Sequence, residues 1–328
     1  MILEKGPGKK NEFEYVSYPI LKVFPEQSLP GDLYLFLNGH FVKYKTKDDN
    51  ISQQKFELFV LQKVQYVFVT KQDAPAYKSW SDRLSGQVKE ELITGVGQEN
   101  VGVVEQHLEV RDEYLSFVSK EVTEESVKEV LTKTRNFIQT IKEKHNADKF
   151  TAKLLSYSQH VADHSTNVAN LSVFLALNTG YSQQLILENI YLGGLLHDFG
   201  KTKIDPKVLE EPQTSKKYQT AIRKHPELGK TSLLLDSGFS EEVLRIVGEH
   251  HERQDGTGYP KGIKGSKIYD LTKIISIANV FDNLVMASQG EIKGRQIKAF
   301  RVLESDQGKM FDPKILGKCL RSMERVII

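Results

Sequence analysis

The sequence contains a single cysteine, Cys319, among its 328 residues. One thiol excludes a disulfide within the chain, and it excludes zinc clusters that need several thiolates. Histidine and carboxylate side chains must therefore hold any metal. No run of about 18 apolar residues occurs, so no membrane span is predicted. The amino terminus has no long apolar core behind its charges and does not resemble a secretory signal. These absences favour a cytoplasmic protein.

The sequence also lacks an excess of either charge. Its 45 basic and 43 acidic side chains leave a formal charge of +2, which gives no reason to expect a nucleic acid polymer as partner. Because 328 residues exceed the usual size of a single domain, we expect two domains, each with its own core.

Residues 1–85 are predicted to form a small α/β domain. Asn38-Gly39 separates DLYLFL from HFVKYK and predicts a two-residue hairpin turn. Further predicted elements are a helix over 48–63, a strand over 66–70 and a short helix over 74–84 that carries Trp80. No cluster of catalytic residue types occurs here, so we interpret this domain as a regulatory or interaction domain that binds a signalling protein partner.

Residues 86–145 are highly charged, with apolar residues at helical spacing, and predict a helical connector. Thr123 and Ser126 provide a start signal for its second helix. The connector could instead cover the second domain or form the seam of a homodimer, although no heptad persists long enough to require a coiled coil. His107 and His145 lie here, and we expect both to be solvated.

Six of the nine histidines fall between His160 and His251. A single histidine on an apolar helix is usually a satisfied core or surface residue, but these six stand near acidic, glycine or further histidine residues. With Asp198, they supply nitrogen and oxygen donors from at least four segments, which is the composition of a polynuclear transition-metal site.

The first two of these segments predict ligands at helix positions. His160 and His164 stand four residues apart and therefore on one helix face. LENIYLGGLLHDFGK brings His197 and Asp198 to the end of a helix, where adjacent residues diverge by about 100°. Asp198 could thus bridge two metals while His197 ligates one. Lys201 follows one turn later and could contact a phosphate or protonate a leaving oxygen, unless it only complements the helix dipole.

The later segments supply the remaining histidines. His225 begins a helix with Pro226 in its first turn, where proline is favoured. His250 and His251 end another helix and precede the glycine-containing residues 255–260. Adjacent histidines before such a loop form a specific combination, whereas a glycine-rich turn alone would be weak evidence.

In this order the motifs resemble the HD-GYP family, a branch of the HD superfamily of metal-dependent phosphohydrolases. The matching stretches are LLHDFGK at 195–201, HPELG at 225–229, HHERQDGTGYPKGIKG at 250–265, KIISIANVFDNL at 273–284 and FDPKILGKCL at 311–320. The resemblance implies an all-α bundle over 146–328, and hence an α+β protein overall. It also implies hydrolysis of the bacterial second messenger cyclic di-GMP, to pGpG or GMP, at two or three metal ions, with iron favoured and manganese the alternative.

The resemblance also assigns roles residue by residue. The implied metal ligands are His164, His197, Asp198, His225, His250 and His251. Lys201 would lie beside the scissile phosphate, and Gly258, Tyr259 and Pro260 would contact the substrate. His160 stands where some three-metal members carry a carboxylate, so it is either a further ligand or a hydrogen-bond partner of one.

Two departures from the family pattern leave the function open. Asn279 replaces an aspartate ligand, and Asp282 could compensate. In residues 288–298 the family's basic phosphate-binding segment is missing, and Lys293 or Arg295 could stand in for it. We favour a metallophosphodiesterase. The alternative is a binding module that keeps the metals and the nucleotide pocket but has lost turnover. A metal that only stabilises the bundle would leave Lys201 and the glycine loop unexplained.

Overall fold

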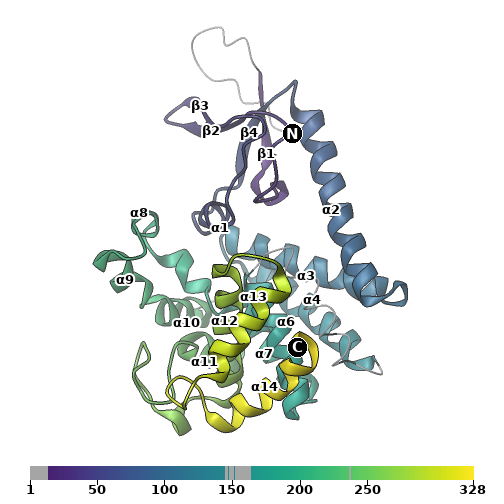
Figure 1. Cartoon of the computed structure of the whole chain (residues 1–328). Coiled ribbons are helices and arrows are strands. Elements are labelled where there is room, and N and C mark those ends of the chain that lie inside the picture. Colours follow the sequence, from purple (N-terminus) through teal and green to yellow (C-terminus); the bar gives the residue numbers. More distant parts are fainter. Residues whose placement is uncertain (1–13, 145–146, 148–150, 152–163, 236–237) are drawn as a thin grey trace. The chain divides into compact units, whose positions relative to one another are not determined.

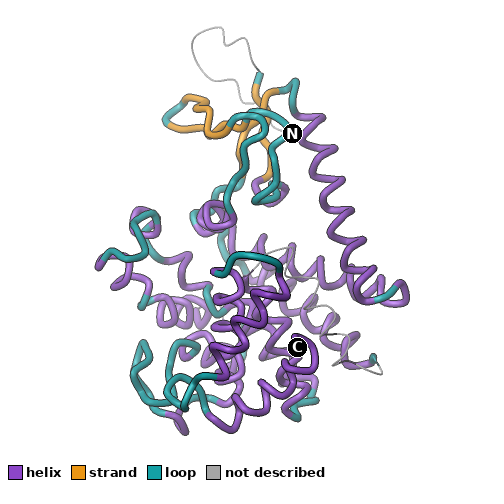
Figure 2. Tube along the Cα trace, in the orientation of Figure 1, coloured by secondary structure: helices purple, strands orange, loops and turns teal. Residues whose placement is uncertain are grey.

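The computed structural model describes residues 14–144, 147, 151, 164–235 and 238–328 (Figure 1). It divides into two compact units, Met1–Glu91 with Leu115–Glu121 and Leu92–Tyr114 with Val122–Ile328. The expected domain limits at 85 and 145 stay a prediction. The α+β class is confirmed, because the strands of the described residues lie in the first unit and the second unit is helical (Figure 2).

The first unit contains a four-stranded antiparallel sheet in the order β1-β4-β2-β3. Its strands are β1 (Tyr15–Pro19), β2 (Leu33–Leu37), β3 (His40–Lys45) and β4 (Tyr66–Thr70), and η1 (Ile20–Lys22) follows β1. The expected hairpin is confirmed between β2 and β3, and its turn residues Asn38 and Gly39 have φ angles of 52° and 82°. Positive φ at both positions is the requirement of a type I′ turn.

The two helices that follow differ in length from the prediction. α1 (Gln53–Leu61) begins later than residue 48, because Asp48 has a φ of 68° and Ser52 caps the helix by accepting the Lys55 N–H. α2 (Ala74–Val96) extends well past residue 84. Gly86 does not end it. The cost of a glycine in a helix is only about 1 kcal/mol, and the apolar residues of the last turns are buried.

The next helices are α3 (Val101–Ser119), preceded by η2 (Gln98–Asn100), and α4 (Glu124–Glu143). The expected start of α4 is confirmed, since Thr123 and Ser126 form a reciprocal capping box. The prediction for His107 is wrong: it is 2% exposed, and its ring centre lies 5.7 Å from that of Phe137. It shares the buried stripe of α3 with Val103 and Val110, and this burial lowers its pKa to about 3. His145 lies outside the described residues.

The second unit is built around α6 (His164–Thr179), in which every residue from Ser165 to Ala176 is buried. Helices α7, α12 and α14 pack against it. The remaining elements are α7 (Gln184–Leu196), η4 (Phe199–Lys203), α8 (Pro206–Leu209), α9 (Lys216–Ile222), α10 (His225–Leu235), α11 (Glu241–Glu249), η5 (Gly265–Lys267), α12 (Asp270–Ala287), α13 (Ile292–Glu304) and α14 (Pro313–Ile327). Within the described residues, no helix combines the length and the apolar character needed to cross a membrane.

Candidate metal centre

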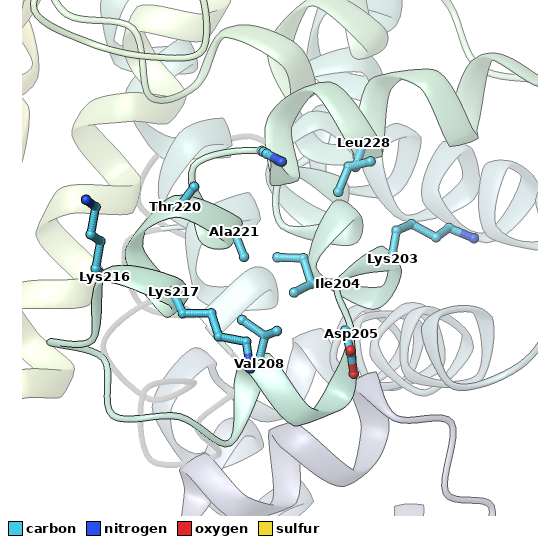
Figure 3. Close-up of a pocket in the computed structure, with 10 residues that line it drawn as sticks. Lys203, Ile204, Asp205, Val208, Lys216, Lys217, Thr220, Ala221 and Leu228 are labelled. Carbon is cyan, nitrogen blue, oxygen red and sulfur yellow. The ribbon is translucent and has the colours of Figure 1, made fainter.

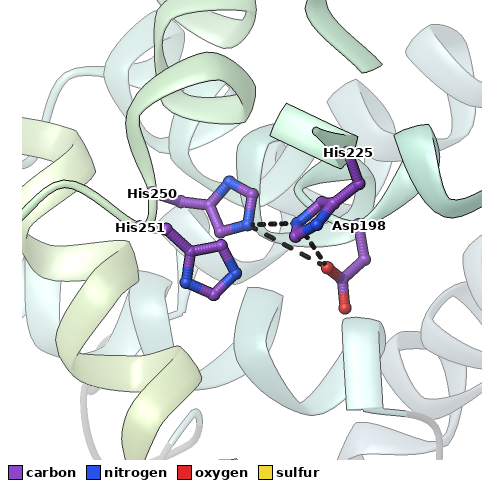
Figure 4. A group of neighbouring side chains, drawn as sticks. All are labelled: Asp198, His225, His250 and His251. Carbon is purple, nitrogen blue, oxygen red and sulfur yellow. Dashed lines mark hydrogen bonds and ion pairs between the residues drawn. The ribbon is translucent and has the colours of Figure 1, made fainter. Parts of the chain in front are cut away.

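The ends of four helices converge on one cluster of histidines around Asp198. His164 is the first described residue of α6, and His197 and Asp198 follow α7 directly. His225 begins α10, while His250 and His251 follow α11. The structure therefore brings together all six residues that the resemblance implied as ligands, from separate segments. Figure 4 shows four of them, Asp198, His225, His250 and His251.

Close backbone packing fixes the relation between Asp198 and His225. Gly200 lies in η4, two residues after Asp198, and a side chain at this position would place a Cβ 1.9 Å from the carbonyl oxygen of His225. Only glycine permits this approach. Glycine at position 200 is therefore needed for η4 to pack against the start of α10.

The two carboxylate oxygens of Asp198 face different histidines. Oδ1 lies 3.1 Å from Nε2 of His225 and 3.9 Å from Nε2 of His250. Oδ2 lies 3.3 Å from Nε2 of His197 and 3.8 Å from Nε2 of His164. One carboxylate is thus shared by two groups of nitrogen donors, as a bridge between two metal ions requires.

These two groups are compact enough to hold ions. One ligand atom from each of Asp198, His225, His250 and His251 lies within 4.8 Å of the others, and the same is true of His164, His197 and Asp198. We name them the Oδ1 group and the Oδ2 group. Together they form a cluster suited to a multinuclear metal site.

The imidazoles are oriented by hydrogen bonds from their outer nitrogens. His197, His225 and His250 donate Nδ1–H to the carbonyl oxygens of Gly194, Ile222 and Val247, at 2.7, 2.6 and 2.8 Å. The Nδ1 of His164 instead donates to the carboxylate of Asp282, also at 2.7 Å. Each partner fixes the tautomer in which the Nε2 lone pair points toward Asp198.

Burial keeps most of these histidines neutral. It is the main reason that the pKa of His250 and that of His251 lie well below the usual value. It also lowers the pKa of His197, although the nearby charge of Asp198 opposes this. A neutral imidazole is the form that ligates a metal, so these side chains are ready to do so near pH 7.

The charged members of the cluster are stabilised by their partners. Burial disfavours the negative charge of Asp198, but Lys201 and the histidines outweigh it and hold the pKa of this carboxyl well below its usual range. Burial likewise lowers the pKa of His164, yet the hydrogen bond and charge of Asp282 raise it above the usual value. The Lys201 ammonium lies 2.6 Å from Oδ2 of Asp198.

The donor set fits transition-metal ions. Nε2 of His225 lies 3.0 Å from Nε2 of His250, and Nε2 of His197 lies 3.3 Å from Nε2 of His164. With the outer nitrogens protonated, neutral imidazoles would direct lone pairs at one another and at a carboxylate. Such a concentration of acceptors suits cations between them, and imidazole with carboxylate suits zinc, iron or manganese more than calcium.

The glycine loop, residues 252–264, is held beside the Oδ1 group by a buried carboxylate. Glu252 is 4% exposed and accepts the backbone N–H groups of Lys261 and Ile263 at 2.7 and 3.0 Å. A Cβ on Gly258 would lie 2.4 Å from the backbone nitrogen of Arg253, so this position also requires glycine. Glu252 was not among the residues predicted from the sequence, although an acidic residue directly after two histidines was an available signal.

Tyr259 is the loop residue that contacts the histidine cluster, and its peptide bond to Pro260 is cis. Its ring stacks on that of His251, with centres 4.5 Å apart and planes 23° apart. The guanidinium carbon of Arg223, another residue that we missed, lies 4.6 Å from the centre of the same ring. The available signal was a basic side chain two residues before His225.

Two cavities lie near this loop and the start of α10. A cavity of about 370 Å³ is lined by Arg223, Lys224, Glu227, Leu228 and loop residues 258–260. A second cavity of about 660 Å³ shares Lys224 and Leu228 with it and extends between η4, α8 and α9 (Figure 3). Its lining is largely apolar, with lysines at the edge. None of the six candidate histidine and aspartate ligands lines this larger cavity.

The remaining predicted site residues that the structure describes are not part of either histidine group. Asn279 is buried in α12, and its carboxamide oxygen accepts the side-chain N–H of Asn283 at 2.6 Å. Asp282, one turn later, contacts His164 through the outer nitrogen and so supports a ligand. Lys293 is exposed on α13, and Arg295 donates to the carbonyl of Val285 at 3.5 Å. His160 lies outside the described residues.

The comparison with protein families agrees with this geometry. The model of the HD domain family matches residues 149–315, about half of the chain. The chain belongs to the HD domain family. The resemblance that the motifs indicated is thereby confirmed, and the matched range includes the segments that carry the six candidate ligands.

Curated relatives within the family are named as phosphodiesterases. The 3'3'-cGAMP-specific phosphodiesterase 1 of Vibrio cholerae serotype O1 is 36% identical over 131 residues, which are 40% of this chain and 30% of that protein. The cyclic di-GMP phosphodiesterase response regulator RpfG of Xanthomonas campestris pv. campestris is 27% identical over 208 residues, 60% of this chain and 54% of that protein. The matches thus span about half of these relatives or less.

A solved structure shares the fold. Bd1817, described as an HDG"Y"P protein from Bdellovibrio bacteriovorus, matches 95% of this chain and 100% of its own, with a TM-score of 0.57 and 18% sequence identity. At this identity the match establishes the fold and not the chemistry.

Proposed function

We propose that this chain is a metal-dependent phosphodiesterase that hydrolyses cyclic di-GMP, with 3'3'-cGAMP as the alternative substrate. One observation carries the proposal. The two carboxylate oxygens of Asp198 face separate histidine groups, and the Lys201 ammonium lies 2.6 Å from the oxygen Oδ2. Both substrates agree with the names of the relatives.

The two histidine groups are the proposed metal-binding part of the site. The Oδ1 and Oδ2 groups would hold two metal ions, for which iron is our first choice and manganese the second, because the donors are imidazole and carboxylate without thiolate. Such ions lower the pKa of a bound water and neutralise phosphate charge. A third ion would require His160 or Asn279, and this stays a prediction.

Lys201 supplies a fixed positive charge at the reacting end of the site. In hydrolysis, water adds to phosphorus, the bond from phosphorus to the ribose 3′ oxygen breaks, and that oxygen takes up a proton. An ammonium held beside Asp198 can stabilise the charge that develops on the phosphate oxygens or deliver this proton. Gly258, Tyr259 and Pro260 would line the substrate side, since all three border the smaller cavity.

The alternative is a protein that binds metals and a cyclic dinucleotide without turning it over. Two features favour it: the neutral amide at Asn279, and the bond from Arg295 to the Val285 carbonyl, which occupies a cation that was expected to bind phosphate. Residues 1–85 would then report occupancy to a signalling partner, either within one chain or in a homodimer.

Product analysis separates the two functions. Metal-loaded protein is incubated with cyclic di-GMP, and separately with 3'3'-cGAMP, under reducing conditions. We expect pGpG or GMP from the first substrate and no product after chelation or in Asp198→Ala. Tight binding without product would replace the enzyme by the binding module, and the absence of both would contradict the proposed function.

A further inference from the structure

Arg223 is an unexpected cation beside the candidate metal centre. It lies between α9 and α10, two residues before His225, and its guanidinium carbon is 4.6 Å from the ring centre of Tyr259. Tyr259 in turn stacks on the candidate ligand His251. A guanidinium over a tyrosine face is attracted by the ring quadrupole and keeps its N–H groups available at its edges.

The Arg223 guanidinium has no acidic partner among the described residues. Arg223 is exposed, and within the described part of the chain its guanidinium forms no salt bridge or hydrogen bond. Glu227 lies four residues later along the chain and borders the same cavity, yet it is not paired with Arg223. The contact with Tyr259 therefore holds a positive charge without an acidic partner at the edge of the smaller cavity.

The surrounding cavity has room for part of a ligand. It measures about 370 Å³, and its walls come from residues 223–228 and from residues 258–260. These are the segments that also contain or adjoin His225 and His251. A ligand whose reacting group lies at the histidine cluster would extend first into this cavity, where Arg223 and Lys224 supply positive charge.

A cyclic dinucleotide has two phosphodiesters, and only one can occupy the reacting position at a time. The other keeps its negative charge and needs a partner of its own. Lys293 and Arg295 were expected to supply one, but Arg295 donates to the Val285 carbonyl and Lys293 is exposed on α13. A planar guanidinium can donate two parallel hydrogen bonds to phosphate oxygens, which an ammonium cannot.

We propose that Arg223, held by the Tyr259 ring, binds the phosphodiester of a cyclic dinucleotide that is not being cut. The inference rests on the proposed function and names the contact that would distinguish a cyclic dinucleotide from a simple phosphodiester. Arg223 binds substrate and takes no part in bond cleavage. Its removal should therefore raise KM and Kd and leave kcat nearly unchanged.

The test uses the metal-loaded full chain and two substrates. Loss of a charged hydrogen bond weakens binding by about 1.5 to 3 kcal/mol, or roughly 10- to 100-fold. We expect Arg223→Ala to raise KM and Kd for cyclic di-GMP by this factor and to change kcat by less than about threefold. Hydrolysis of bis(p-nitrophenyl) phosphate, which has one phosphodiester, should be unaffected. Arg223→Lys should recover only part of the loss, because an ammonium lacks the planar fork.

Lys216→Ala is the matched control, because it removes one exposed positive charge from the neighbouring helix α9. It should leave the cyclic di-GMP affinity within about twofold, since screened surface charges contribute little. An equal loss in Lys216→Ala, or an equal loss on both substrates in Arg223→Ala, would overturn the assignment.

Direct binding of a fluorescent cyclic di-GMP separates this inference from the proposed function. If the wild-type chain binds the nucleotide and Arg223→Ala binds it equally well, only the role of Arg223 is wrong. If the chain binds without turnover, the Kd ratio alone decides the role of Arg223. If the metal-loaded wild-type chain neither binds nor cleaves it, the proposed function and this inference both fail.

Discussion

The Oδ1 and Oδ2 groups share Asp198 but differ in how they are built. In the Oδ1 group the side chains of His225 and His250 are 1% and 0% exposed, and backbone carbonyls anchor their outer nitrogens. In the Oδ2 group the His164 side chain is 17% exposed and depends on the side chain of Asp282. The Oδ2 group also has one histidine fewer among its described members.

This difference predicts unequal metal positions. The Oδ1 group has three imidazoles, of which His225 and His250 are held by backbone carbonyls. Oδ2 already attracts the Lys201 ammonium, and one of its two imidazoles, His164, is partly exposed. More ligands and greater rigidity favour tighter metal binding. We therefore expect one ion to stay through purification at the Oδ1 group and the other to exchange, so that the second position limits activity.

Removing the shared carboxylate should have the largest effect, because it is the one ligand that the two positions have in common. We expect Asp198→Ala to lose both ions and all detectable phosphodiesterase activity. Metal per chain after desalting is the measurement. Asp112→Ala, which removes an exposed carboxylate from α3, should retain both ions. One ion retained in full by Asp198→Ala would contradict the shared bridge.

Lys201 allows metal binding to be separated from turnover at the Oδ2 group. Lys201→Ala removes the ammonium from Oδ2, so this oxygen becomes a better ligand and metal content should be kept or slightly increased. The developing phosphate charge loses its partner, and kcat should fall by about 10²- to 10³-fold. Metal analysis and single-turnover rates on one preparation test both. A parallel loss of metal and rate would assign Lys201 to the structure of the site.

Asp282 offers a selective change of the Oδ2 group. Asp282→Asn keeps the shape of the side chain but removes the negative charge next to His164 Nδ1, which is 2.7 Å away. Mutation of such supporting groups costs about 10- to 100-fold in metal affinity. Competition with a chelator should show one position weakened by this factor and the other unchanged. Equal weakening of both positions would indicate that the groups are not independent.

Much of the site was predictable because its motifs are local. His197 and Asp198 at the end of a helix, His225 at the start of another, and His250 and His251 before a glycine loop all depend on a few neighbouring residues. The hairpin and the capping box were predictable for the same reason.

The remainder depends on contacts between distant segments. No local pattern indicates that Arg223 meets Tyr259, or that Asp282 meets His164 across 118 residues. Burial of His107 became visible only with the full stripe of α3, and the length of α2 depended on how its last turns were covered.

Changing Asn279, which belongs to neither group in the described structure, should have the smallest effect. Asn279 lies one helical turn before Asp282 in α12. The HD-GYP motif that this segment resembles has an aspartate at the position of Asn279. Asn279→Asp adds one anionic oxygen and still offers an acceptor to Asn283, whose N–H lies 2.6 Å from the present amide oxygen. We expect about a tenfold gain in retention of the weaker ion, because a charged ligand binds a cation more strongly than a neutral amide.

The matched control for this gain is Asn283→Asp, which adds the same charge one turn later in the same helix. If Asn283→Asp raises metal retention as much as Asn279→Asp does, the gain comes from the added negative charge in general and not from a ligand at position 279. A specific gain accompanied by faster hydrolysis would show that the weaker position limits the enzyme. A specific gain without hydrolysis of any cyclic dinucleotide would shift attention to residues 288–298, and the binding module would then replace the phosphodiesterase.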